Sequence, residues 1–295
     1  MHPRGHRGNL VLMKERVSTR TRKSLLFCGA LLVLITRSLF ALEPTPQAVS
    51  AYNAYIATIE SRLSRQHVSA NAFLAPLSAA RDQARLRTGE LLVEKIADPA
   101  AVHPPGAMLY HWRGTAFAPG ARADDFERLM KDFAAYPNHF SPSVLKTSIL
   151  AHSIDRGNDR FHVSMRVRQH HVITIVLDTT YDVTFGRLDP CHGYSTSRST
   201  SISEISAPGT PNERALSADE DHGFLWRLNT YWSYEERPEG LYMQIETVSL
   251  TRSVPPGLAW AVQPFLDSVP RESLEATLRS TCNALQASRL RAQTR

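Results

Sequence analysis

The 295-residue chain has the apolar (42%) and charged (21%) fractions of an ordinary globular protein, which predicts one main domain with an appendage. Its net charge of +6 comes from residues 1–41, which hold eight of the 34 Lys and Arg residues and one of the 28 Asp and Glu residues. The remainder is close to neutral, and this argues against nucleic-acid binding by the folded part.

The N-terminal segment has the layout of a secretory signal peptide. A basic stretch from Lys14 to Lys23 precedes an apolar run from Ser24 to Ile35, and a less apolar segment ends at Ala41. We expect residues 1–41 to be a cleaved signal peptide, with Met13 as an alternative start, and the protein to be exported to the periplasm or cell envelope. The apolar run is shorter than the roughly 20 residues of a spanning helix, and an uncleaved anchor over residues 24–41 is the alternative.

Two cysteines remain after such a leader, Cys191 and Cys282. An exported protein could join them in a disulfide. Cys282 lies on the apolar stripe of the last helical segment, however, and this position favours a buried free thiol.

Residues 42–104 predict a helical N-terminal extension. Val49, Tyr52, Ile56 and Ile59 have helical spacing within residues 47–67, and residues 77–87 form a second helical stretch. The segment 89–96 could form a short strand before the break at Pro104, Pro105 and Gly106. We place the main domain at residues 105–288 and a basic tail at 289–295.

The main domain reads as a strand, a helix, six antiparallel strands and a long helix. The alternating pattern predicts strands over 108–117, 146–155, 160–169, 172–184, 193–206, 223–235 and 240–252, and helical spacing predicts a helix over 123–137. After residue 257 an apolar stripe at helical spacing runs to Val269, and a second begins at Leu274 and ends at Leu285, with Pro270 suited to a first helical turn. The fold class is therefore α+β, a curved antiparallel seven-stranded sheet packed against a long C-terminal helix.

This order resembles that of the START-like (SRPBCC, Bet v 1-type helix-grip) superfamily, whose members include lipid-transfer proteins, polyketide cyclases/aromatases and pollen-allergen-type proteins. The resemblance covers roughly residues 108–285, and its local motif consists of Phe126, Leu129, Asp132, Tyr136, Pro137 and Pro142. It implies a cavity between sheet and long helix that accepts an apolar or amphipathic ligand. It implies nothing definite about catalysis, since the superfamily contains carriers, binding proteins and enzymes.

Polar side chains on two strands are candidate ligand contacts. Arg227, Asn229 and Tyr231 share one face of their strand, and Trp226, Leu228 and Trp232 share the other. If the polar face looks into the cavity, Arg227 and Glu246 could form a buried pair that orients a ligand carboxylate or hydroxyl; otherwise this face is solvated. The cavity candidates are Trp112, Arg227, Asn229, Tyr231, Glu246, Trp260, Leu274 and Leu278.

Motifs for a nucleophile or a metal are missing from the sequence. It contains no Gly-x-Ser-x-Gly and no Cys-x-x-Cys, and the adjacent His170 and His171 would point to opposite faces of a strand. We therefore expect neither a cofactor nor a metal. The preferred function is binding or transfer of an apolar, lipid-like small molecule in the cell envelope, with transient membrane contact as an additional possibility. The alternatives are a cofactor-free cyclase- or hydrolase-like enzyme that uses His111, Tyr231 or Glu246 as acid or base, and an interaction module whose cavity is filled.

Overall fold

The fold comes from a computed structural model, which describes residues 43–76, 80–96, 104–170, 174–253 and 259–293, with only the backbone for 80, 170, 259–267, 292 and 293. All these ranges belong to one compact unit, Ala41–Arg295. The expected leader over residues 1–41 lies outside them. Among the helices within these ranges, none combines the length and the apolar composition that a membrane span requires.

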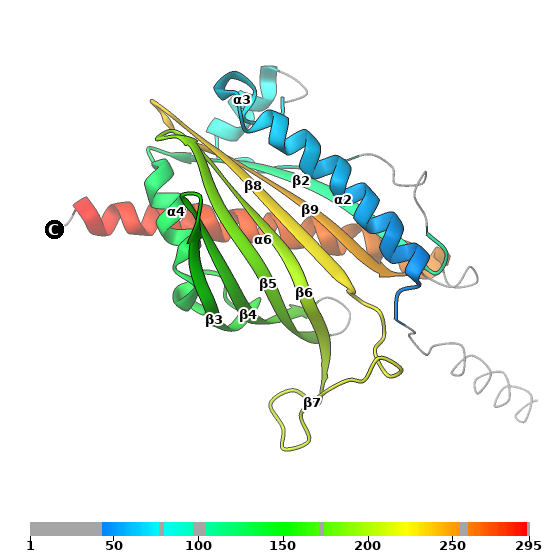
Figure 1. The fold of residues 1–295 in the computed structure, drawn as a ribbon. Helices are drawn as coiled ribbons and strands as arrows, with labels where there is room; N and C mark the ends of the chain where they lie inside the picture. The colour runs from blue at the N-terminus through cyan, green and yellow to red at the C-terminus, as the bar shows by residue number, and fades with distance from the viewer. Residues whose placement is uncertain (1–42, 77–79, 97–103, 171–173, 254–258, 294–295) are drawn as a thin grey trace, which may run out of the picture. The chain divides into compact units, whose positions relative to one another are not determined.

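One curved antiparallel sheet is the centre of the fold (Figure 1). Its strand order is β1-β2-β9-β8-β6-β5-β4-β3, and β7 pairs with β6. The seven expected strands are all present, and two short strands, β1 and β7, extend the sheet. The strands are β1 (Leu92–Lys95), β2 (Ala107–Pro119), β3 (Val144–Asp155), β4 (Asn158–His170), β5 (Thr174–Asp189), β6 (His192–Ser206), β7 (Arg214–Ala215), β8 (Arg227–Arg237) and β9 (Gly240–Arg252).

The helices precede, interrupt and follow the run of strands in the predicted order. They are α2 (Pro46–Gln66), η1 (Ala70–Ala72), α3 (Ala80–Arg87), α4 (Ala123–Lys131), η3 (Phe133–Ala135), α5 (Tyr136–His139) and α6 (Ala259–Gln293). The predicted α+β class, with a curved antiparallel sheet and a long C-terminal helix, is confirmed. One detail differs, because α6 is a single helix of 35 residues that continues through Pro270, where the sequence indicated a fresh helical start.

Helix α6 packs on one face of the sheet over a glycine, Gly114 of β2. Leu274, Leu278 and Leu285 of α6 are buried in the larger apolar cluster of the protein. Beneath them, a Cβ atom on Gly114 of β2 would lie 2.6 Å from Leu278 Cδ1, far inside van der Waals contact. Glycine at this position therefore lets the helix approach the strand closely.

Helix α2 covers the opposite face of the same sheet (Figure 1). It begins at an N-cap in which Thr45 Oγ1 accepts a hydrogen bond from the Ala48 amide (3.1 Å), with a proline in the first turn. Its apolar stripe packs on outward-facing side chains of β2, β8 and β9. The buried members of this second cluster are Ala48, Tyr52, Ile56, Ile59, Leu63, Ala107, Leu109, Tyr231, Val248 and Leu250.

The N-terminal extension contacts the sheet through two elements. Helix α2 lies on its outer face, and β1 pairs with β2 as an additional edge strand. The sheet is therefore sandwiched between α2 and α6, and each face has its own chemistry.

The close approach of α6 to β2 can be tested by a double-mutant cycle. Leu278→Ala is expected to lower the free energy of unfolding by about 3 kcal/mol, because it leaves a cavity in a fully buried site. Gly114→Ala should lower the free energy of unfolding by roughly 1–3 kcal/mol through overpacking. The decrease should be smaller in the Leu278→Ala background, where the clashing methyl group is gone.

Urea unfolding of the two single variants and the double variant measures this coupling. Arg279→Ala, on the exposed side of the same helix, is the control and should change little. If the losses in free energy of unfolding of Gly114→Ala and Leu278→Ala simply add in the double variant, the contact between these two residues is contradicted.

Candidate functional site

The face of the sheet beneath α6 is filled at one end by aromatic side chains. Phe126 of α4 packs on Trp232 and Tyr234 of β8, with ring centroids 5.2 and 4.6 Å apart. Leu241, Met243 and Ile245 of β9 complete this end, and all three are at most 3% exposed. This half of the face is a packed core and leaves no room for a ligand.

At the other end of the same face, the inward-facing side chains keep part of their surface accessible. The cross-strand pairs Thr230–Thr247 and Leu228–Ser249 connect β8 and β9 there. The partly exposed side chains of this open half are Met108, Met165, Leu228, Thr230, Thr247 and Ser249. Small hydroxyls and flexible apolar side chains thus take the place of the large rings of the packed half.

Trp112 of β2 lies between the two halves with a polar atom that lacks a partner. Its side chain is 7% exposed and faces α6 with the larger apolar cluster, and Thr247 is its neighbour on β9. Its Nε1 atom is buried and forms no hydrogen bond to any residue that the structure describes. A buried donor without an acceptor is costly, so an oxygen acceptor placed beside this atom would be favourable.

Three of the apolar cavity candidates lie on this face. Trp112, Leu274 and Leu278 all belong to the cluster beneath α6. The backbone of Trp260 lies in α6, but its side chain is outside the described residues.

The polar candidates require a correction, because they lie on the opposite face of the sheet. Tyr231 belongs to the cluster under α2, and Asn229 and Glu246 share its face by strand alternation. These three side chains are 2–5% exposed and do not line the space beneath α6. The physical reason is that α2 of the N-terminal extension buries this polar face.

Arg227 also lies away from α6, and the Arg227–Glu246 pair that would follow if the polar face looked into the cavity does not form. In the β8–β9 register, Arg227 is opposite Leu250 and Tyr231 is opposite Glu246, so the two residues are about 13 Å apart along the strands. Arg227 instead donates to the carbonyl oxygen of Trp226 (2.9 Å) and lines a groove of about 400 Å³. Trp226 packs with the α2 cluster. Strand alternation predicted it on the opposite face, with Leu228.

Glu246 is the centre of a buried ionic network that joins α2 to the sheet. Its Oε1 accepts from Arg113 Nε (3.0 Å), and its Oε2 accepts from His111 Nε2 (2.9 Å) and from Arg62 of α2. His111 is fully buried, and its Nδ1 lies 2.9 Å from the hydroxyl of Tyr55, also on α2. With Nε2 donating to the carboxylate, Nδ1 of a neutral ring accepts from Tyr55.

The network sets the charge state of Glu246. Burial alone would raise the pKa of this carboxyl group, but the hydrogen bond from His111 and the charges of Arg113 and Arg62 outweigh it and lower the pKa to about 2. Glu246 is therefore a fixed anion at neutral pH. His111, Tyr231 and Glu246, considered above as acids or bases for the space beneath α6, lie on the wrong face for that role.

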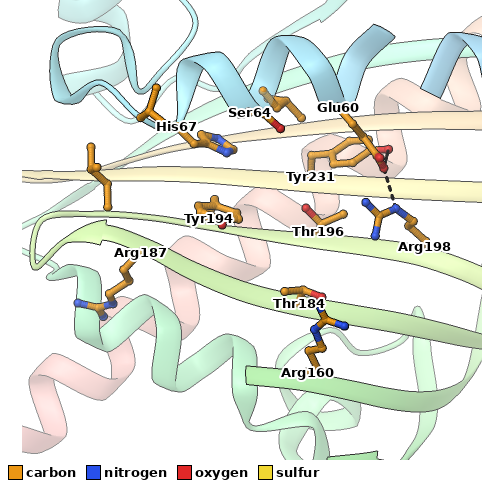
Figure 2. Close-up of a pocket in the computed structure, with 13 residues that line it drawn as sticks. Glu60, Ser64, His67, Arg160, Thr184, Arg187, Tyr194, Thr196, Arg198 and Tyr231 are labelled. Carbon is orange, nitrogen blue, oxygen red and sulfur yellow. Dashed lines mark hydrogen bonds and ion pairs between the residues drawn. The ribbon is translucent and has the colours of Figure 1, made fainter. Parts of the chain in front are cut away.

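A groove that the sequence did not reveal opens beside α2 on the outer face of the sheet (Figure 2). Its volume is about 590 Å³, and α2, β4, β5, β6 and β8 contribute to it. The lining residues are Glu60, Leu63, Ser64, His67, Val68, Arg160, Thr184, Arg187, Leu188, Tyr194, Thr196, Arg198 and Tyr231. Of these residues, strand alternation predicted a face only for Tyr231, and the register that aligns the others across strands is not readable from the sequence.

His67 borders this groove as a neutral ring. It stacks on Tyr194 with a centroid distance of 4.5 Å, and its Nε2 lies 2.7 Å from Ser233 Oγ. Burial and the charge of Arg62 lower the pKa of His67 to about 4. Within the described ranges, no three His, Cys, Asp or Glu side chains are grouped as a metal ion would require.

No family model and no curated protein sequence matches the chain. The Zhui aromatase/cyclase of Streptomyces sp. R1128 is similar in structure, with 16% identity and a TM-score of 0.41 over 61% of this chain and 94% of that one. A STAR-related lipid transfer protein fragment from Xanthomonas axonopodis has 17% identity and a TM-score of 0.39 over 66% and 98%. Human STARD10 has 11% identity and a TM-score of 0.41 over 74% and 84%. These neighbours are START-superfamily proteins, and the likeness concerns the fold alone.

Replacement of Glu246 tests the buried network. Glu246→Gln should lower the free energy of unfolding at pH 7 by about 3 kcal/mol, because two guanidinium groups lose their buried counter-charge. The carboxyl group has a lower pKa when folded (about 2) than its ordinary 4.5, so the unfolded chain takes up its proton first as the pH falls. Its contribution is therefore complete above pH 4.5 and is lost between pH 4.5 and about 2.

Urea unfolding at pH 7, 4.5 and 3 checks this expectation. Between pH 4.5 and pH 3, the free energy of unfolding should fall more for the parent protein than for Glu246→Gln. Glu94→Gln removes an exposed carboxylate from the same Arg113 and should behave like the parent. An equal acid response of parent and Glu246→Gln would show that the Glu246 carboxylate does not carry this stability.

Proposed function

We propose that the protein binds an apolar or amphipathic small molecule in the open half of the sheet face beneath α6. The observation that carries the proposal is the contrast along this face. Large aromatic rings fill one end, whereas Met108, Leu228, Thr230 and Thr247 keep accessible surface at the other although they point inward. Inward-facing side chains that their own fold buries only in part are typical of a ligand site.

The unpartnered Trp112 Nε1 adds a polar requirement. A ligand that fills the open half would bury this donor completely, so its carbonyl, hydroxyl or carboxylate oxygen should accept from it. The ligand is therefore amphipathic, with one oxygen function near Trp112 and an apolar body against the methionine and leucine side chains.

The two alternative functions have less support from the geometry. The acid–base candidates of an enzyme lie under α2, on the other face of the sheet. A cavity filled by its own side chains describes the Trp232 end but not the partly exposed Thr230 end. Binding or transfer is thus the better account of this face.

We further propose that binding takes place in the cell envelope. The support for this location is the leader, whose basic stretch and short apolar run over residues 14–35 are typical of a secretory signal. N-terminal sequencing of protein recovered from the envelope of its own cells is expected to begin near Leu42. Intact Met1 or Met13 on protein from the soluble cytoplasmic fraction would contradict export.

Ligand binding should be blocked by filling the open half. Burying roughly 300 Å² of apolar ligand surface at about 25 cal/mol per Å² gives about 7 kcal/mol, which the costs of association reduce toward micromolar affinity. Thr247→Phe places a ring beside Trp112 and is expected to weaken binding at least tenfold. Ser148→Phe adds the same ring to an exposed position of edge strand β3 and should leave affinity unchanged.

Titration of the purified proteins with fatty acids, sterols and aromatic polyketide-like probes, followed by tryptophan emission, measures these affinities. Mass spectrometry of lipid extracted from protein isolated from its own cells identifies a co-purifying ligand. If no probe gives a saturable change and nothing co-purifies, the proposal fails and a filled interaction module is the better account.

A further inference from the structure

The groove beside α2 exists because this helix covers only part of the outer face. Its stripe packs on β2, β8 and β9, and the outer face of β4, β5 and β6 continues beyond its edge (Figures 1 and 2). The strand registers align one row of polar side chains across this boundary. From the open side toward α2 the row is Arg160, Thr184, Thr196 and Tyr231.

The floor of the groove offers unused hydrogen-bonding groups. Thr184 and Thr196 are partly exposed, and neither hydroxyl bonds to another described residue. The exposed Ser64 hydroxyl on α2 has no such bond within the described ranges either. Three hydroxyls thus face the same space from two strands and a helix.

Two guanidinium groups border these hydroxyls. Arg198 binds Glu60 Oε1 through its Nε (2.6 Å), and its two Nη atoms have no hydrogen bond to any residue that the structure describes. Arg160 pairs with Asp155 at 2.6 Å, but both side chains are about half exposed, so this pair is weak. Arg187 differs, because Asp124 and Glu127 hold its guanidinium group.

The position of these two arginines suits a shared anion. They lie on β4 and β6, about 10 Å apart across the strands. On β5 between them, Thr184 is opposite Arg160, and Asp182, whose Oδ1 lies 2.8 Å from His162 Nδ1, is opposite Arg198. Arginine side chains can close that distance on one phosphate or carboxylate, which they bind with charge-assisted hydrogen bonds. Glu60 does not cancel the site, since Arg198 and the Tyr231 hydroxyl (3.0 Å) already bind its carboxylate.

The other end of the groove is apolar. Val68 is 74% exposed and Leu188 is 38% exposed, and the stacked rings of His67 and Tyr194 lie with them along the lining. Aliphatic and aromatic surface next to an anion site favours a ligand with a planar or apolar body.

We propose that this groove is a second binding site, for a small molecule that carries a phosphate or carboxylate group on an apolar or aromatic body. The oxyanion lies between Arg160 and Arg198 above Thr184 and Thr196, and the body lies along Tyr194 and Val68. The site is on the face of the sheet opposite the one beneath α6 and does not depend on the function proposed there.

Calorimetric titration of the full-length protein with phenyl phosphate tests the site. Phenyl phosphate should bind saturably, and more tightly than inorganic phosphate, which lacks the ring, or benzyl alcohol, which lacks the charge. Arg160→Gln and Arg198→Gln should each weaken it about tenfold, the effect of one lost charge-assisted hydrogen bond. Arg168→Gln, farther along β4 on the same face, should have no effect.

Two further variants separate a loss of binding from a loss of folding and test whether the bound group is an anion. Thr184→Val keeps the shape of a partly exposed side chain and should weaken phenyl phosphate about threefold, with an unchanged midpoint of thermal unfolding. Glu60→Gln removes a negative charge from the rim and should tighten binding. Weaker binding to Glu60→Gln, or equal losses in Arg160→Gln and Arg168→Gln, would overturn the proposal.

Sedimentation with phosphatidylcholine vesicles, with and without phosphatidylglycerol, identifies the source of the anion. Retention that needs both phosphatidylglycerol and Arg160 would support the proposal and assign a lipid headgroup. Phenyl phosphate binding without retention would support it with a soluble ligand. Absence of both binding and retention would overturn it.

Discussion

The burial of one carboxylate, that of Glu246, determines how the rest of the structure is arranged. A charged group 3% exposed at the centre of the sheet must be fully paired, and β2 supplies only His111 and Arg113. Arg62 completes the pairing, and it comes from α2. Helix α2 must therefore lie across β2, β9 and β8 at one position, which buries Tyr231, leaves the outer face of β4–β6 open as a groove, and leaves the opposite face to α6.

The two faces of the sheet use different physical interactions. Beneath α6, contact is apolar and close, and Gly114 allows Leu278 to approach to a distance that no other residue would permit. Beneath α2, buried polar groups such as Glu246 and His111 lie beside the apolar stripe and are hydrogen-bonded. An amphipathic ligand suits the first face because hydrocarbon dominates there, with Trp112 Nε1 as the exception. An anionic ligand suits the second, where Arg160 and Arg198 face unpaired hydroxyls.

The sequence by itself determined the elements and their order. Alternation over two residues and spacing near 3.6 residues are local properties, so they are visible without any tertiary contact. They predicted seven strands, α2, α4 and a long C-terminal helix, and hence the α+β class. They also predicted that the stripe with Leu274 and Leu278 packs on the sheet, because one apolar stripe on a helix has to meet one face of a sheet.

Only the tertiary structure decided which face of each strand meets which helix. Alternation puts Arg227, Asn229 and Tyr231 on one face of β8, but the β8–β9 register decides that Glu246 joins them. Whether α2, α6 or solvent covers that face depends on contacts between residues as distant as Arg62 and Glu246. The register between neighbouring strands is likewise decided only by the tertiary structure. The row from Arg160 to Tyr231 crosses four strands whose turns and bulges fix the alignment, and a shift of one residue would move these side chains to the other face.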